Sequence, residues 1–251
     1  ILMKAVLFVE RSLLGQKPTF SLFTENGIPW FMFAMAVFGL LTYLLRDVDP
    51  RILVLFFIIT ACFAGYDTKI GDAFVLSRIL IFYPFYLAGH IIPQEQLISL
   101  RHNKSLRLAA VLFLCAWAIA CLLFLDKLYP LRPLFTGRNP FSGSFLTFGP
   151  LWRLLCYALS SLGIISCILL VPEKKIPPFT AFGSRTLQVY FWHRPVIYLL
   201  SHFSLPAFFS SSHLLQLVWL GLGVVTTLLL SLKPFGFPTD HVLRFSRSQK
   251  K

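Results

Sequence analysis

Two ionisable residues and a proline, His193, Arg194 and Pro195, interrupt an apolar run near the end of the chain, TLQVYFWHRPVIYLL (186–200). The imidazole and the guanidinium are groups that can take part in a reaction. The run is long enough to enter a membrane, where an arginine costs about 2.5–3.5 kcal/mol on insertion scales. Proline adds to this cost because it leaves a helical carbonyl without its usual donor. Charged residues of this kind are retained where they face protein or water, so the run indicates a polar interior.

The same run carries the functional groups that an acid–base reaction uses. On a 3.6-residue period, Tyr190, His193 and Arg194 lie on one side of a helix. A guanidinium binds anionic or carbonyl oxygens through a planar fork of donors, and an imidazole exchanges protons near neutral pH. We predict that His193 and Arg194 are catalytic and that Tyr190 binds substrate. The alternative is a polar network that locks this helix to its neighbours.

A second candidate helix is LSRILIFYPFYLAGH (76–90), which carries Arg78 near one end and a helix-bending proline at Pro84. Arg78 and Tyr86 are two turns apart on one face, so we predict that both point into the bundle and bind substrate. The alternative for Arg78 is an extended side chain that reaches the membrane surface.

A third group surrounds the long connection 126–150. Arg138 and Asn139 lie within it, and Trp152 and Arg153 lie at the entrance of the next apolar segment. Aromatic faces and planar amide or guanidinium donors suit hydroxyl-rich ligands, so Arg138 and Arg153 are predicted to bind a sugar. Trp30, which opens an earlier segment, is a further candidate, with interfacial anchoring as its alternative.

The composition places these residues in a membrane protein. Of 251 residues, 57% are hydrophobic, 16% are aromatic and only 13% are charged, whereas soluble domains carry about 25% charged residues. The apolar runs are continuous rather than alternating, which argues against strands. We predict an all-α, polytopic transmembrane helix bundle. Its expected segments are a partial one at about 1–14 and full ones at about 28–45, 52–66, 76–92, 107–125, 151–171, 185–203 and 214–232.

The distribution of basic residues predicts the orientation. Thirteen Lys and Arg residues lie in one set of connections and seven in the alternating set. The richer set is expected in the cytoplasm, which places the basic tail 233–251 there and the loop 126–150 outside. The protein is therefore predicted to be a multi-pass protein of the cell membrane, in contact with lipid.

Several classes of function have no support in the sequence. The net charge of +13 is scattered through short connections, with no nucleic-acid motif. The five cysteines show no CxxC spacing, and no helix carries His and carboxylate at ligand spacing, so no metal site is predicted. P-loop, GxGxxG, GxSxG and HExxH motifs are not found.

Three stretches resemble the membrane acyltransferase 3 family, and most closely its fucose 4-O-acetylase-like subgroup. They are TLQVYFWHRPVI after AFGSR, LSRILIFYPFYLAGH, and the segment entrance IPWFMFA. The resemblance implies an integral-membrane enzyme of ten helices with both termini in the cytoplasm. Such enzymes take an acyl group, usually acetyl, from cytoplasmic acetyl-CoA and pass it to a hydroxyl of a carbohydrate or lipid-linked acceptor of the cell envelope.

The resemblance also implies which parts of the family are present. Residues 1–251 are expected to form a single integral-membrane acyltransferase domain containing helices three to ten. The family's first helix, with an Arg and a presumed catalytic His about three turns later, is expected upstream. Arg78 and His90 look similar but lie in a different helix. A transporter or flippase of an envelope precursor is the main alternative, and a helical scaffold is a third; oligomeric state stays open.

Overall fold

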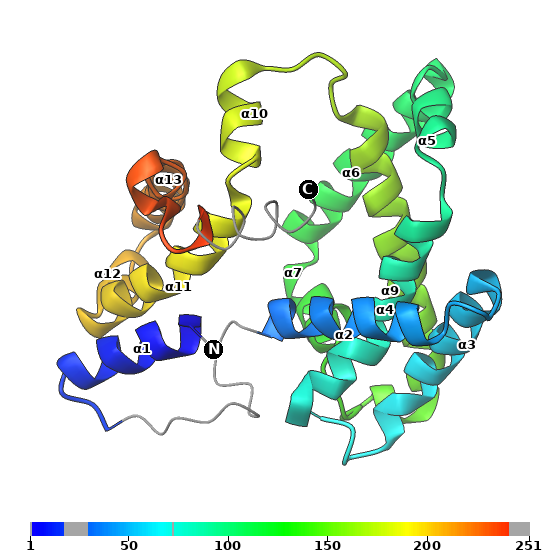
Figure 1. Ribbon diagram of the computed structural model, residues 1–251, viewed down its shortest axis with the longest axis horizontal. Coiled ribbons are helices and arrows are strands. Elements are labelled where there is room, and N and C mark those ends of the chain that lie inside the picture. Colours follow the sequence, from blue (N-terminus) through cyan, green and yellow to red (C-terminus); the bar gives the residue numbers. More distant parts are fainter. Residues whose placement is uncertain (1, 18–29, 72, 241–251) are drawn as a thin grey trace, which may run out of the picture. The chain divides into compact units, whose positions relative to one another are not determined.

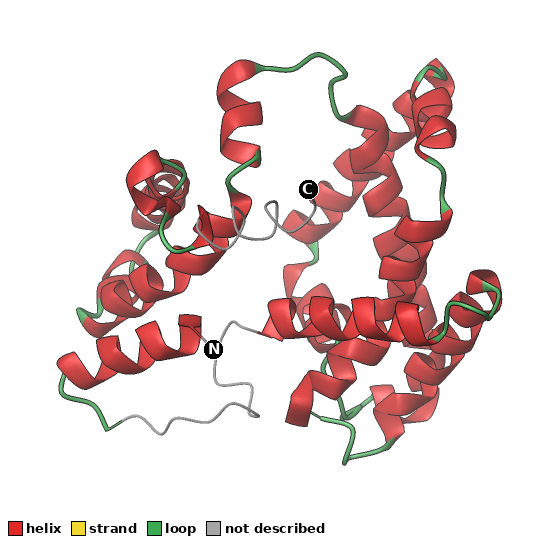
Figure 2. Ribbon diagram, in the orientation of Figure 1, coloured by secondary structure: helices red, strands yellow, loops and turns green. Residues whose placement is uncertain are grey.

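The fold is described from a computed structural model of the chain, for residues 2–17, 30–71 and 73–240. Within these ranges the secondary structure is helical, with no strand (Figure 2). The chain forms two compact units, one of residues 23–172 and one of residues 1–22 with 173–251. We call them the central unit and the terminal unit. The all-helical prediction is thus confirmed for the described residues.

The central unit is built from apolar helices joined by short helical turns (Figure 1). Its longer helices are α2 (Trp30–Leu44), α3 (Pro50–Phe63), α4 (Leu76–Ile91), α5 (Gln94–Arg101), α6 (Lys104–Leu123) and α9 (Phe145–Leu170). Its short elements are η1 (Ala64–Tyr66), η2 (Ala73–Val75), α7 (Leu125–Leu128), η3 (Tyr129–Leu131) and α8 (Arg132–Phe135).

Local signals set where these helices begin and end. Asp49 begins α3 by accepting a hydrogen bond from the Arg51 backbone N–H at 2.8 Å, and Asn103 begins α6 in the same way. Such caps satisfy amide groups that the helix leaves without partners. At the C-terminal end of α9, the Arg101 guanidinium donates to the carbonyls of Ile168 and Val171. A positive charge there is favourable because this is the negative end of the helix dipole.

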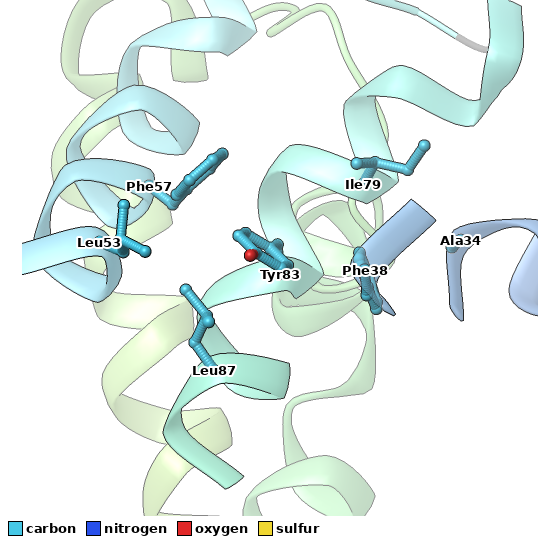
Figure 3. Packing of buried hydrophobic residues seen from close by; sticks show 7 residues of the cluster. All are labelled: Ala34, Phe38, Leu53, Phe57, Ile79, Tyr83 and Leu87. Carbon is cyan, nitrogen blue, oxygen red and sulfur yellow. The ribbon is translucent and has the colours of Figure 1, made fainter. Parts of the chain in front are cut away.

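The core of the central unit lies where α2, α3 and α4 meet (Figure 3). Tyr83 of α4 is completely buried and packs edge-on against Phe57 at 4.7 Å between ring centres. Its hydroxyl lies 3.1 Å from the Thr42 hydroxyl, so the one polar atom of the ring is satisfied inside an apolar cluster. The cluster consists of Ala34, Phe38, Leu53, Phe57, Ile79, Tyr83 and Leu87.

Two helices, α6 and α9, are each long and apolar enough to cross a membrane, and they pack along one another (Figure 1). The pair α4 and α5, bent by 84°, forms a third candidate span. The helices α2, α3 and α13 (His213–Leu230) are apolar but shorter. The structure therefore supports a helical membrane protein, while the predicted number of eight segments remains a prediction.

The terminal unit surrounds α11 (Thr186–His202), which contacts α1 (Leu2–Leu13), α12 (Leu205–Phe209), α13 and η4 (Lys233–Gly236). The remaining helix of this unit is α10 (Pro177–Gly183). Two side chains at the start of α11 donate to backbone carbonyls at and just after the end of α13. Gln188 donates to Leu230 and Leu232, and Arg185, the residue before α11, donates to Ser231. These bonds fix α11 against the end of α13.

Candidate functional site

One end of the central unit gathers the beginnings of α2, α4 and α9 together with η1. Arg78, in the first turn of α4, is only 5% exposed, and its guanidinium carbon lies 4.5 Å from the centre of the Trp30 ring at the start of α2. Arg78 is therefore held inside the protein by a cation–π contact, and the extended, surface-reaching conformation is not adopted.

The turn before α4 is strained. Phe74 and Val75 both have positive φ, at 52° and 57°, a region that a β-branched residue such as Val75 rarely enters. Such strain costs on the order of 1–3 kcal/mol per residue and persists where the surroundings impose it. Here the strained turn leads directly into the helical turn that carries Arg78.

The connection 126–150 folds back over Arg78. Gly137 has φ +70°, and a Cβ at this position would lie 3.1 Å from Phe82 and 3.4 Å from the Cγ of Arg78. Only glycine combines this backbone conformation with such a close approach. The turn at Gly137 thus brings the following residue, Arg138, into the same cavity lining as Trp30 and Arg78.

Asn139 and Phe141, which follow Arg138 in the chain, anchor the connection to η1. The Asn139 side chain donates to the Ala64 carbonyl at 3.1 Å, and the Phe141 backbone N–H donates to the Gly65 carbonyl at 2.7 Å. The Phe141 ring fills a slot between Gly65 and Gly149, where an added Cβ would lie 2.4 and 2.3 Å from ring carbons. The two glycines therefore make room for the ring that holds the connection in place.

Together these elements enclose a cavity of about 370 Å³, which we call the arginine cavity. It contains three guanidinium groups and an aromatic wall. Its lining residues are Trp30, Arg78, Phe82, Arg132, Pro133, Phe135, Thr136 and Arg138. Trp30, Arg78 and Arg138 were predicted site residues, and the fold brings all three to one place.

Arg132 was not predicted as a site residue. It lies in RPLFTGR, six residues before Arg138, and two arginines flanking a Pro- and Gly-containing turn are the signal that points to it in hindsight. Within the described part of the chain, neither Arg132 nor Arg138 has a carboxylate within 4.0 Å. The charges of Arg132 and Arg138 are thus suited to an anion such as a phosphate or carboxylate.

Arg153 lies behind the arginine cavity and is only 1% exposed. One terminal nitrogen donates to the Asn139 side-chain oxygen at 2.8 Å and to the Arg138 carbonyl at 3.4 Å, and the guanidinium carbon lies 5.1 Å from the Phe141 ring centre. Its Nε and other terminal nitrogen have no hydrogen-bond partner among the described residues. A buried charge with unused donors is costly, and the bonds to Asn139 and Arg138 and the contact with Phe141 offset only part of that cost.

A small hollow of about 20 Å³ adjoins Arg153, between the cavity-lining residues Phe82 and Phe135 and the α9 residues Cys156, Tyr157 and Ser160. Tyr157 donates its hydroxyl to the Ile81 carbonyl at 2.6 Å and is thus occupied in joining α9 to α4. The hollow places Arg153 next to the arginine cavity although Arg153 does not line the cavity itself.

Tyr86 is placed differently from the prediction. It shares a face of α4 with Arg78, but its ring packs against Phe38 at 5.3 Å and stacks on Tyr83 at 6.2 Å between ring centres. Tyr86 therefore flanks the core of α2, α3 and α4, and it is not among the residues that line the arginine cavity. We assign it a packing role.

The other predicted residues lie on α11 in the terminal unit. His193 and Arg194 are half-buried. The His193 Nδ1 lies 2.8 Å from the Tyr190 carbonyl and 3.2 Å from the Val189 carbonyl, and its ring is 5.7 Å from that of Tyr190. Arg194 has no hydrogen bond or salt bridge to any residue that the structure describes.

Metal-ligating side chains do not gather in the described residues: no group of three His, Cys, Asp or Glu has the geometry to hold an ion. The charged groups that do gather are arginines. They suit the phosphate of an anionic ligand, since guanidinium groups bind phosphate in bidentate fashion.

Comparison with known families gives a match over most of the chain. Residues 4–232 match the family model Acyl_transf_3, described as an acyltransferase domain. No curated protein and no solved structure matches the chain. The family match runs through both units and includes the helices that carry Arg78, Arg153 and Arg194. The chain therefore belongs to the acyltransferase 3 family.

Proposed function

We propose that this protein is a membrane O-acyltransferase of the fucose 4-O-acetylase-like kind. It moves an acyl group, usually acetyl, from cytoplasmic acetyl-CoA to a hydroxyl of a carbohydrate of the cell envelope. The observation that carries the proposal is the family match over residues 4–232, and the apolar helices support a membrane location. The Lys and Arg distribution supports a cell-membrane protein with its C-terminus in the cytoplasm.

The reaction is an acyl transfer from a thioester to an alcohol. The acceptor oxygen attacks the thioester carbonyl, a C–O bond forms, the C–S bond breaks, and the hydroxyl proton passes through a base to the leaving CoA sulfur. The carbonyl oxygen carries negative charge in the transition state, so a positioned guanidinium lowers the barrier. We assign this oxyanion role to Arg194.

The hydrogen-bond geometry of His193 supports a role in proton transfer. Its Nδ1 lies against the carbonyls of Tyr190 and Val189, and a carbonyl oxygen can only accept a hydrogen bond. In the neutral ring the proton therefore belongs on Nδ1, which leaves Nε2 with a lone pair. This is the tautomer that a base or proton relay requires.

A deletion strain tests the proposal in the organism that carries the gene. We expect the envelope carbohydrate of the deletion strain to lose its O-acetyl groups, with the amount and export of the carbohydrate unchanged. Reintroducing the wild-type gene restores the acetyl groups, and Arg194→Gln does not. Loss of carbohydrate export with normal acetylation of the remainder would contradict the proposal and favour a transporter.

A further inference from the structure

A third hollow extends the chain of cavities in the central unit. It measures about 310 Å³ and lies between α6 and α9, with Trp117 of α6 and Gly163 of α9 on its walls. No charged side chain lines it. Its lining residues are Phe113, Leu114, Trp117, Phe135, Leu159, Ser160 and Gly163.

Phe135 connects the three hollows. It lines the arginine cavity, the small hollow beside Arg153 and the apolar hollow between α6 and α9, and its ring centre lies 6.1 Å from that of Trp117. Ser160 is shared by the last two hollows and Phe82 by the first two. The hollows therefore adjoin one another around Phe135 of α8.

The polar and apolar groups lie at different levels along α9. Helix α9 begins at Phe145, just after the connection that carries Arg132 and Arg138. At about 1.5 Å of rise per residue, Gly163 lies about 15 Å farther along the helix than Arg153. The guanidinium groups thus cluster nearer the beginning of α9, which is long and apolar enough to cross a membrane, and the apolar hollow lies farther along this helix.

We infer that the three hollows together bind one lipid phosphate. The phosphate lies among Arg78, Arg132 and Arg138, where charge complementarity is greatest, and the hydrocarbon chain passes Phe135 into the apolar hollow between α6 and α9. That this lipid is the acyl acceptor, its sugar hydroxyl receiving the acyl group, rests on the proposed function.

A binding experiment on the purified full-length protein in detergent micelles tests the site. Native mass spectrometry measures how much long-chain phosphatidic acid binds, with diacylglycerol of the same chains as the uncharged probe and dihexanoyl phosphatidic acid as the short-chain probe. We expect long-chain phosphatidic acid to bind at least about tenfold more tightly than either of the other two.

Two sets of variants separate the head site from the chain site. The double variant Arg132→Gln with Arg138→Gln is expected to weaken the binding of both the long-chain and the short-chain phosphatidic acid at least about tenfold. Gly163→Phe places a ring in the apolar hollow, where an added Cβ meets nothing within 4 Å. This variant is expected to weaken only the binding of the long-chain lipid. Gly163→Leu serves the same purpose if the phenylalanine variant does not fold.

Matched controls come from exposed positions of the same unit. Arg107→Gln removes an exposed arginine at the other end of α6, and Gly39→Phe adds a ring at an open, exposed glycine of α2. Neither change is expected to alter lipid binding.

Equal binding of diacylglycerol and phosphatidic acid would overturn the site, as would loss of long-chain selectivity in the controls. Displacement of the lipid by acetyl-CoA in proportion to occupancy would reassign the arginine cavity to the acyl donor. Specific lipid binding without acyl transfer would leave the lipid site standing and contradict the proposed function. Acyl transfer to a water-soluble sugar without phosphatidic acid binding would support the proposed function and contradict the lipid site.

Discussion

The guanidinium of Arg153 donates to the side-chain oxygen of Asn139 across 2.8 Å, and the Asn139 amide donates in turn to the Ala64 carbonyl. This chain of bonds joins the buried charge on α9 to the end of α3 through a residue of the connection 126–150. The amide is well suited to the task because it accepts on one side and donates on the other. The position of Arg138 beside Arg78 depends on this linkage.

Removing the amide should therefore destabilise the protein. We predict that Asn139→Ala lowers the free energy of unfolding by about 1–3 kcal/mol, because it leaves a buried charge and a carbonyl with fewer partners. Thermal unfolding of the detergent-solubilised protein measures the effect. In a double-mutant cycle with Arg153→Met, the second change should cost less once Asn139 is absent. Strictly additive losses would show that the two residues are not coupled.

The slot that holds Phe141 gives a second prediction. Gly65→Ala and Gly149→Ala place a methyl group 2.4 and 2.3 Å from the Phe141 ring, so each should destabilise the fold by about 1–3 kcal/mol through overpacking. Gly39→Ala, in the open middle of α2, is the matched control and should be neutral or stabilising by up to about 1 kcal/mol. Equal melting temperatures for all three variants would contradict the tight fit of the Phe141 ring against Gly65 and Gly149.

Helix α11 carries both a residue that stabilises the fold, Gln188, and a residue without a structural partner among the described residues, Arg194. Gln188 donates to the Leu230 and Leu232 carbonyls and is 3% exposed, so Gln188→Leu should cost about 1–3 kcal/mol of stability. Arg194 has no such partner among the described residues, so Arg194→Gln should leave the melting temperature unchanged. The reverse ranking in a thermal-shift measurement would assign Arg194 a structural role.

The sequence predicted the helices well where long apolar runs dominate. The predicted segments 76–92 and 107–125 correspond to α4 (Leu76–Ile91) and α6 (Lys104–Leu123), because caps and apolar composition are local properties. The connection 126–150 was expected to contain no further span. It contains the short elements α7, η3 and α8, and its last six residues form the start of α9, which begins at Phe145 rather than at the predicted residue 151.

Parts of the candidate site depended on contacts between distant residues, which a single sequence does not reveal. Arg132 and Arg138 reach Arg78 only because Gly137 turns against Phe82 and because Phe141 enters its slot between Gly65 and Gly149. Periodicity put Tyr86 on the same face as Arg78, yet the Phe38 ring occupies the space next to it. Helical period assigns a face, and the neighbouring helix decides whether that face is core or cavity.

The most direct test of acyl transfer uses membranes that contain the full-length protein, its envelope carbohydrate acceptor and acetyl-CoA labelled in the acetyl group. We predict that label enters the carbohydrate as an ester released by mild alkali, and that Arg194→Gln lowers the initial rate on the order of 10²-fold, the loss typical of removing an oxyanion donor. If wild-type membranes transfer no more label than membranes lacking the protein, the acyltransferase assignment is contradicted. If Arg194→Gln transfers label at the wild-type rate, Arg194 is not in the catalytic site.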